Sequence, residues 1–118
     1  MEVNTMAHVL NFNTVKKTYL TVTLADEKQT TLMIGTPTKS VMDNLLTLEE
    51  TFKNVSEDEI DANIMDDLYQ ASAKIMSNNK TRTKITAEQL ADLFDFEDIF
   101  LFFSAYMDYV SAIIESKN

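Results

Sequence analysis

Few side chains in this sequence have the chemistry of an active site. The chain has one histidine, His8, and no cysteine, which excludes a thiolate nucleophile, a disulfide framework and a Cys-ligated metal. A general base must be held in a fixed geometry beside a partner, but His8 lies in a polar, weakly patterned stretch, so we interpret it as a surface histidine. Because these residues do not supply a nucleophile, a base and oxyanion donors together, we expect a protein that is not an enzyme and has no cofactor.

The carboxylates gather in two groups, one at residues 57–61 and the other at Asp66 and Asp67. A metal site would need oxygen ligands that converge, and a calcium-binding loop would also need a glycine at its sharp turn. The single glycine, Gly35, lies far from both groups in the sequence. The first group instead falls at the predicted start of a helix, where the helix dipole favours negative charge. We therefore expect helix-start carboxylates and no metal site.

Residues 80–84 alternate basic and hydroxyl side chains, with Lys80, Arg82 and Lys84 as the cations. Such a segment could contact phosphate groups, but it lacks the aromatic side chains on which nucleic-acid bases stack. The surrounding half of the chain is also strongly acidic, since residues 57–118 hold five basic and thirteen acidic side chains. We interpret the segment as a solvated connector between helices.

The charge of the whole chain argues against two classes of partner. The formal net charge is −9 at pH 7, and an acidic surface repels phosphate backbones and anionic lipids, so we expect no nucleic acid and no membrane as partner. The longest uninterrupted apolar run is Ile99–Phe103, much shorter than the ~20 residues of a membrane span. The first residues also lack the basic and apolar regions of a signal peptide. A soluble, cytoplasmic protein is the expectation.

The chain of 118 residues is long enough for one domain with one core. Residues 1–13 are polar and weakly patterned, which predicts a mobile lead-in or a marginal strand, and residues 14–118 are then a single domain. Residues 18–35 contain two runs in which apolar and polar side chains alternate, joined by a short polar turn. This alternation predicts an antiparallel β-hairpin. A hairpin alone is marginal in water, so another element must cover one of its faces.

Helices are predicted downstream of the hairpin, at about residues 40–55, 57–77, 87–94 and 96–116. Each begins at a residue pair with N-cap spacing, after which apolar side chains recur at steps of three and four. These pairs are Ser40 with Asp43, Ser56 with Glu59, Thr86 with Gln89 and Asp95 with Asp98. Because all helices follow the strands, we predict an α+β fold, an N-terminal antiparallel β-hairpin followed by a bundle of three to four helices.

The last predicted helix is apolar around an unusually large part of its circumference. One continuous apolar face runs from Phe96 to Ile114, and a second stripe beside it widens the apolar arc to about 180°, whereas a surface helix needs about 100°. The second stripe is either buried between two neighbours in the bundle or a docking surface for another copy or a partner helix. We favour a docking surface. The helix predicted over residues 57–77 shows a weaker version of the same second stripe. The candidate residues of the docking surface on both helices are Phe102, Tyr106, Tyr109, Ile113, Met65 and Tyr69.

The order of these features resembles the small tail assembly chaperones of long-tailed, siphovirus-type phages and of prophages in Gram-positive bacteria. The residues that carry the resemblance are the strand Lys16–Leu24, the break Gly35–Lys39, the acidic helix after it, and the step Lys84–Leu90 into an aromatic last helix. The similarity is one of pattern and spans roughly residues 10–116, without a single diagnostic motif.

The resemblance implies a protein without catalytic activity that binds the phage tape measure protein. It would keep that long helical chain soluble, help to recruit the major tail tube protein, and leave before the virion is complete. The resemblance also implies a homo-oligomer, the host bacterial cytoplasm as location, and a longer frameshifted product of the same gene. Two other classes stay open: a structural virion component, such as a head–tail joining protein, and an acidic mimic of DNA.

Overall fold

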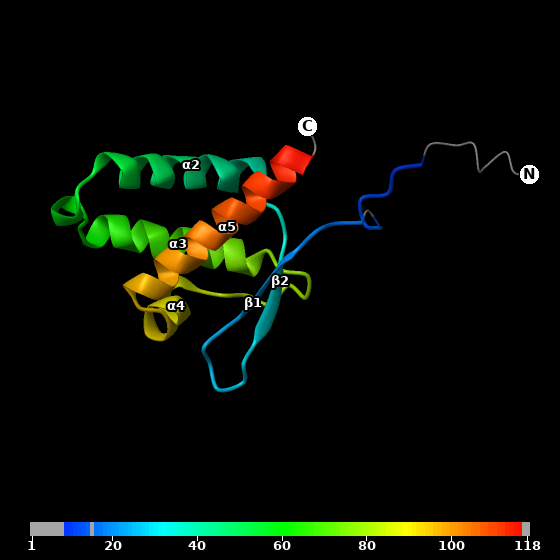
Figure 1. Ribbon diagram of the computed structural model, residues 1–118. Helices are drawn as coiled ribbons and strands as arrows, with labels where there is room; N and C mark the ends of the chain where they lie inside the picture. Colours follow the sequence, from blue (N-terminus) through cyan, green and yellow to red (C-terminus); the bar gives the residue numbers. More distant parts are fainter. Residues whose placement is uncertain (1–8, 15, 117–118) are drawn as a thin grey trace, which may run out of the picture.

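The computed structural model of the protein describes residues 9–14 and 16–116. Two short strands, β1 (Leu20–Thr23) and β2 (Thr31–Ile34), precede the helices (Figure 1). The helical elements in the described residues are α2 (Lys39–Asn54), the 3-10 turn η1 (Glu57–Glu59), α3 (Ala62–Ser77), α4 (Ala87–Leu93) and α5 (Phe96–Ser116). The predicted α+β fold, a hairpin followed by helices, is confirmed. Most of the predicted lead-in, residues 1–8, lies outside the described residues.

The two strands pair in the antiparallel register that their alternation favours. Val22 lies opposite Leu32, and Leu32 is buried on the face that the helices cover. The turn is held by the carboxylate of Asp26, which accepts hydrogen bonds from the hydroxyl of Thr30 at 2.6 Å and from its backbone N–H at 2.8 Å. These two bonds lower the pKa of Asp26, the hydroxyl bond most strongly. The predicted hairpin is therefore stabilised by hydrogen bonds to the Asp26 side chain in its turn as well as by the backbone hydrogen bonds between its strands.

The first helix starts at a different cap from the one predicted. The hydroxyl of Thr38 accepts the hydrogen bond from the N–H of Val41 at 3.4 Å, which makes Thr38 the N-cap of α2. Ser40, the predicted cap, already lies inside the helix. Both residues have suitable side chains, and the helix begins at the earlier one, directly after the break at Pro37.

The helix predicted over residues 57–77 is interrupted. Ser56 and Glu59 do form the predicted capping box, but it closes on the turn η1, which ends in extended backbone at Ile60. α3 then starts anew at Asp61, whose carboxylate accepts a hydrogen bond from the N–H of Ile64 at 3.0 Å. An N-cap residue has non-helical backbone, so one continuous helix cannot contain the Asp61 cap.

The last two helices begin at the predicted caps. Thr86 and Gln89 form a capping box at the start of α4. Before α5, the carboxylate of Asp95 accepts a hydrogen bond from the N–H of Asp98 at 2.9 Å. Local side-chain chemistry therefore sets where both helices start, and their observed ranges agree with those predicted to within one residue.

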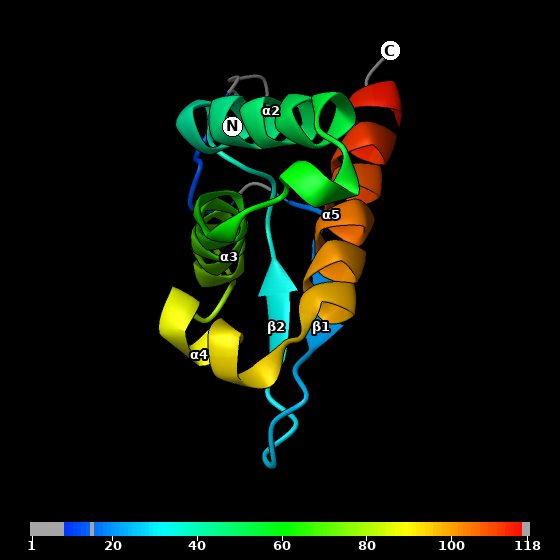
Figure 2. The ribbon, with the colours of Figure 1, turned by 90° about the vertical axis from the view of Figure 1, so that its left-hand side faces the viewer.

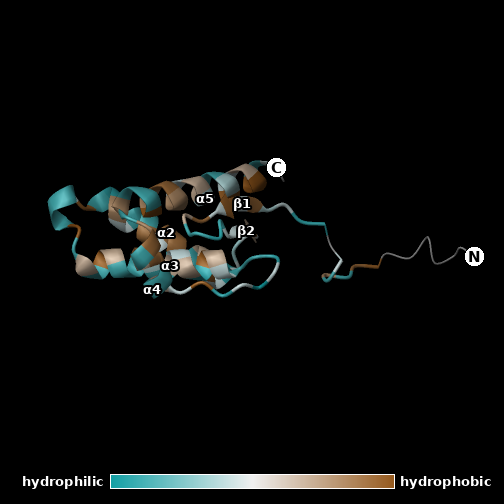
Figure 3. Cartoon of the chain, turned by 90° about the horizontal axis from the view of Figure 1, so that it is seen from below, coloured by the Kyte–Doolittle hydropathy of each residue, from teal (hydrophilic) through white to brown (hydrophobic). Residues whose placement is uncertain are grey.

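The helices are arranged around α3, which packs against α2, α4, α5 and β2. α2 and α3 run side by side, α5 crosses beside them, and the strands lie between α3 and α5 (Figures 1 and 2). One hydrophobic cluster joins the inner faces of the hairpin and the helices, and Leu68, Ile99 and Tyr106 within it are fully buried. Figure 3 shows the apolar faces of the helices turned mainly toward one another.

Candidate functional site: apolar grooves on an acidic domain

The middle of the second apolar stripe on α5 belongs to the core. Tyr106 is fully buried and Phe102 exposes only 6% of its surface. The hydroxyl of Tyr106 donates a hydrogen bond to the carbonyl of Gly35 at 2.9 Å, and burial raises its pKa. The hypothesis that these two residues lie on an open docking surface is therefore wrong. The hairpin covers this stripe while the other helices cover the first one, so α5 is buried on two sides.

The C-terminal part of the same stripe is less deeply buried. The hydroxyl of Tyr109 donates a hydrogen bond to the carbonyl of Thr18 at 2.5 Å. Burial raises the pKa of Tyr109, and the neighbouring Tyr19 adds to this shift. Ile113, one turn further along α5, is half-buried. Tyr109 therefore holds the chain at the entry to the hairpin, which is a structural contact rather than an open surface.

Met65 and Tyr69 lie on α3 at the edge of the core. Met65 exposes 8% of its surface, and the hydroxyl of half-buried Tyr69 donates to the carbonyl of Phe94 at 2.7 Å. Burial raises the pKa of Tyr69, and the carboxylates of Asp95 and Asp98 raise it further. Because the hydrogen bond ties α3 to the residue that ends α4, both side chains are held in a fixed wall between these helices.

That wall faces a groove of about 610 Å³ between α3 and α4, which we call the α3–α4 groove. Phe96, the first residue of α5, closes one part of it and exposes 59% of its surface. The apolar side chains of the groove are Ile60, Ala62, Met65, Tyr69, Ala87, Ala91 and Phe96. Its charged side chains are the carboxylates of Asp61, Asp66 and Glu88, and none of its described lining residues is basic. An apolar floor with an acidic rim is suited to an apolar surface flanked by cations.

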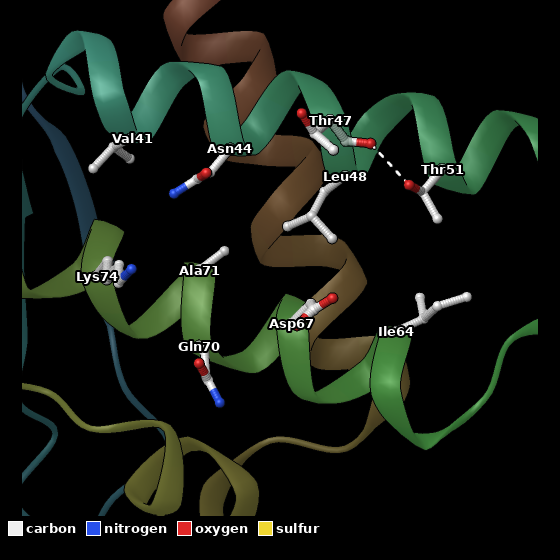
Figure 4. A pocket seen from close by; sticks show the side chains of 10 residues that line it. All are labelled: Val41, Asn44, Thr47, Leu48, Thr51, Ile64, Asp67, Gln70, Ala71 and Lys74. Atoms are coloured by element: carbon white, nitrogen blue, oxygen red, sulfur yellow. Dashed lines mark hydrogen bonds between the residues drawn. The ribbon is translucent and has the colours of Figure 1, made fainter.

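A second cleft, of about 300 Å³, lies between α2 and α3 (Figure 4). Leu48 and Ala71 contribute apolar surface to it, while Asp67 and Lys74 supply one carboxylate and one ammonium group. The dashed line in Figure 4 marks a hydrogen bond inside α2, from the hydroxyl of Thr51 to the carbonyl of Thr47 at 2.9 Å, so these hydroxyls serve the helix itself. The cleft is a gap between packed helices with mixed walls, less apolar and smaller than the α3–α4 groove.

Of the carboxylates predicted at a helix start, those of residues 57–59 lie in the turn η1 and that of Asp61 caps α3. Asp66 and Asp67 lie further along α3. The backbone N–H of Ser56, and then its hydroxyl, donate to the carboxylate of Glu59 and lower its pKa. Among the described residues, no three histidine or carboxylate side chains lie close enough together to hold a metal ion. His8 falls outside these residues.

The connector over residues 77–84 is more ordered than its sequence indicated. Asn79 exposes 7% of its surface, and its side-chain amide donates to the carbonyls of Met76 and Thr83 at 2.7 Å each. The three basic side chains of the connector are exposed, as predicted. The prediction of a solvated connector at residues 80–84 is therefore confirmed, and Asn79 in addition pins the backbone of this segment.

α5 is long and apolar enough to cross a membrane, judged by length and composition alone. The core helix of a soluble domain passes the same test. In this structure Ile99, Phe103 and Val110 of α5 are buried against the rest of the domain, whereas Phe96, Leu101 and Ile114 are exposed. Packing therefore accounts for only part of its apolar composition.

Comparisons with known proteins identified no relative of this chain. No protein-family model, curated protein or solved structure matches the chain. The fold and the groove geometry define a small acidic α+β domain with an apolar groove on its helical side.

Proposed function

We propose that this protein is a phage tail assembly chaperone that binds an amphipathic helical segment of the tape measure protein in the α3–α4 groove. The resemblance of its sequence pattern to such chaperones supplies the biological setting. The observation that carries the proposal is the groove itself, in which Met65, Tyr69 and the exposed ring of Phe96 lie beside three carboxylates. An amphipathic helix laid into an apolar groove is a common mode of recognition between proteins.

The dimensions and charge of the groove suit such a helix. The α3 residues that line the groove run from Ala62 to Gln70, so α3 offers a wall about 12 Å long, a little over two helical turns, at the usual helical rise. A partner helix would place its apolar stripe against Phe96 and Met65 and its flanking lysines or arginines near Asp61, Asp66 and Glu88. Charge pairs at the rim improve the rate and specificity of association more than its affinity. The apolar floor therefore carries the affinity and the rim selects basic partners.

The acidic remainder of the domain has its own role in this proposal. A chaperone for a long helical chain must cover apolar stripes and keep the assembly in solution. A net charge of −9 favours solubility of the complex, and several copies along one chain would bind with avidity even where each contact is weak. Bound copies would then bring tail tube subunits to the tape measure protein and dissociate before the virion is complete.

Co-expression with the tape measure protein tests the proposal. We expect the tape measure protein to become soluble and to copurify with several copies of this protein. The variant Phe96→Glu should abolish copurification, because it puts a charge into the apolar part of the groove. It should not impair folding, because a carboxylate in the first turn of a helix is favourable. Leu46→Glu on α2 is the matched control, since Leu46 is similarly exposed at 47% against 59% for Phe96.

Two outcomes would contradict the proposal. If the tape measure protein stays insoluble with wild-type protein present, the chaperone function is wrong. If Phe96→Glu and Leu46→Glu bind equally well, the α3–α4 groove is not the binding site. The protein should also be absent from purified virions, and stable incorporation there would favour the head–tail joining alternative.

A further inference from the structure

The described part of the lead-in carries a group of apolar side chains that the domain does not cover. Val9, Leu10 and Phe12 expose 82%, 69% and 73% of their surfaces. We call residues 9–14 the N-terminal arm. The arm extends away from the domain in Figures 1 and 3, and part of it has the colour of apolar residues in Figure 3. Three exposed apolar side chains within four residues indicate a segment that is covered by something else in its working state.

A complementary feature lies on the domain, where no strand among residues 9–14 and 16–116 pairs with the second edge of β1. The two-stranded sheet pairs β1 with β2 only. The N–H of Leu24 donates to the carbonyl of Thr30 at 2.8 Å, and hydrogen-bonding direction alternates along an antiparallel strand. The backbone groups of Leu20 and Val22 therefore point to β2, whereas those of Thr21 and Thr23 point to the open edge. An edge of this kind is a template for pairing with another strand.

An apolar groove of about 330 Å³ runs between this edge and α5, and we call it the β1–α5 groove. Leu101, which lines it, exposes 70% of its surface. Phe94, Phe102 and Ala105 line it from the helical side, and Asp98 is the one acidic residue among its described lining residues. The groove thus combines unpaired backbone groups with apolar surface, which are the two requirements for binding an extended apolar segment.

We infer that residues 9–12 of one copy bind as an added strand along β1, in the β1–α5 groove of another copy. In an extended segment alternate side chains share a face, so Leu10 and Phe12 would both face Leu101 and Phe102. Four residues match the length of β1, which also has four. The backbone of the arm would pair with the free N–H and carbonyl groups of Thr21 and Thr23.

The arm can change to an extended form at small cost. Its turn is held by hydrogen bonds from the N–H groups of Thr14 and Asn13 to the carbonyl and side chain of Asn11, both 3.0 Å long. These bonds are exposed to water, so each contributes little net free energy. Ladder hydrogen bonds to β1 would replace them.

The position of the arm favours another copy over its own domain. Tyr109 fixes the carbonyl of Thr18 beside the C-terminal half of α5, whereas the β1–α5 groove lies beside residues 94–105. The chain before Thr18 leads away from the domain (Figure 1). Charge permits the approach, because residues 3–25 contain no carboxylate and two lysines, while the rest of the chain is strongly acidic.

Because the chain contains no cysteine, engineered cysteines can test this arrangement directly. A chain with Phe12→Cys is mixed with a chain with Leu101→Cys under a mild oxidant, and disulfide-linked products are separated on a non-reducing gel. We expect a covalent heterodimer that forms at least about tenfold faster than with the control Leu46→Cys, because binding raises the effective concentration of the two thiols. Leu46 is exposed on α2, away from the groove.

The double variant Phe12→Cys, Leu101→Cys decides between exchange and folding back. Dimers and larger covalent species support exchange between copies, whereas a cross-link found only within single chains overturns it. Equal rates with Leu101→Cys and Leu46→Cys would overturn it as well. The inference rests on the proposed function in that it gives the several copies on one tape measure chain a contact with one another, but the experiment uses this protein alone. Its failure is therefore separate from failure to bind the tape measure protein.

Discussion

At the scale of single residues, buried tyrosine hydroxyls join segments that are far apart in the sequence. Tyr106 is fully buried and donates to the carbonyl of Gly35. Tyr109 is only partly buried, and its bond to Thr18 lies at the surface. A buried carbonyl that loses its donor keeps the full cost of its desolvation, whereas an exposed carbonyl can bond to water. The two tyrosines should therefore differ in their effect on stability.

Replacing Tyr106 by phenylalanine should lower the free energy of unfolding by about 1–3 kcal/mol, since it leaves the Gly35 carbonyl without this donor. Tyr109→Phe, the matched control, should cost clearly less. Urea unfolding followed by circular dichroism measures both. Equal losses would show that the burial of Tyr106 does not matter to its hydrogen bond. Neither change should alter the ladder between β1 and β2, because neither removes a backbone donor from it.

At the scale of elements, the caps decide where the helices start and stop. Asp61 begins α3 through its bond to the N–H of Ile64, whereas Ser56 caps only the short exposed turn η1. Asp61→Ala should lower the free energy of unfolding by about 1 kcal/mol, as lost N-caps do. Ser56→Ala should cost less, because η1 has no buried residue. Thermal unfolding of both variants checks this ranking, and the reverse order would mean that the Ser56 cap contributes more to stability than the Asp61 cap.

The elements were predictable from the sequence because their signals are local. Thr86 with Gln89 and Asp95 with Asp98 are neighbours in the chain, and the alternation in residues 20–34 is complete within the hairpin. The break at Ile60 was missed because two valid cap signals, Ser56 and Asp61, follow each other closely, and periodicity alone does not rank them.

The candidate binding surface was harder to predict because it depends on which element covers α5. The apolar arc of α5 indicated two covered sides but not what covers them. Tyr106 meets Gly35 across 71 positions of sequence separation, and Tyr109 meets Thr18 across 91. The hairpin covers the stripe that we had interpreted as a docking surface. Only Met65 and Tyr69 among the predicted residues line the α3–α4 groove. The exposure of Phe96 depends on its place at the start of α5, where the first apolar stripe extends past the core.

At the scale of the whole molecule, charge and apolar surface act on different parts of binding. The net charge of −9 produces a negative field that attracts cationic segments from a distance, and this attraction weakens as salt screens it. The apolar floor of the α3–α4 groove is insensitive to such screening. A basic amphipathic helix should therefore bind with an affinity that depends on salt, while a neutral helix with the same apolar stripe should bind without that dependence.

A synthetic helix with a leucine stripe flanked by lysines provides the measurement. Its dissociation constant, followed by fluorescence anisotropy, should rise about tenfold between 0.05 and 0.5 M NaCl, because the Debye length falls from ~14 Å to ~4 Å over this range. Asp66→Asn at the rim of the groove should reduce both the affinity and the salt dependence. Asp108→Asn, outside the groove on α5, removes the same charge from the whole molecule and is the control for the general field.

If the two variants behave alike, the field of the entire domain attracts the helix and the rim carboxylates have no special part. If only Asp66→Asn changes binding, local pairing at the groove sets the preference for basic partners. Binding that does not vary with salt in the wild-type protein would contradict both explanations and leave the apolar floor as the sole determinant.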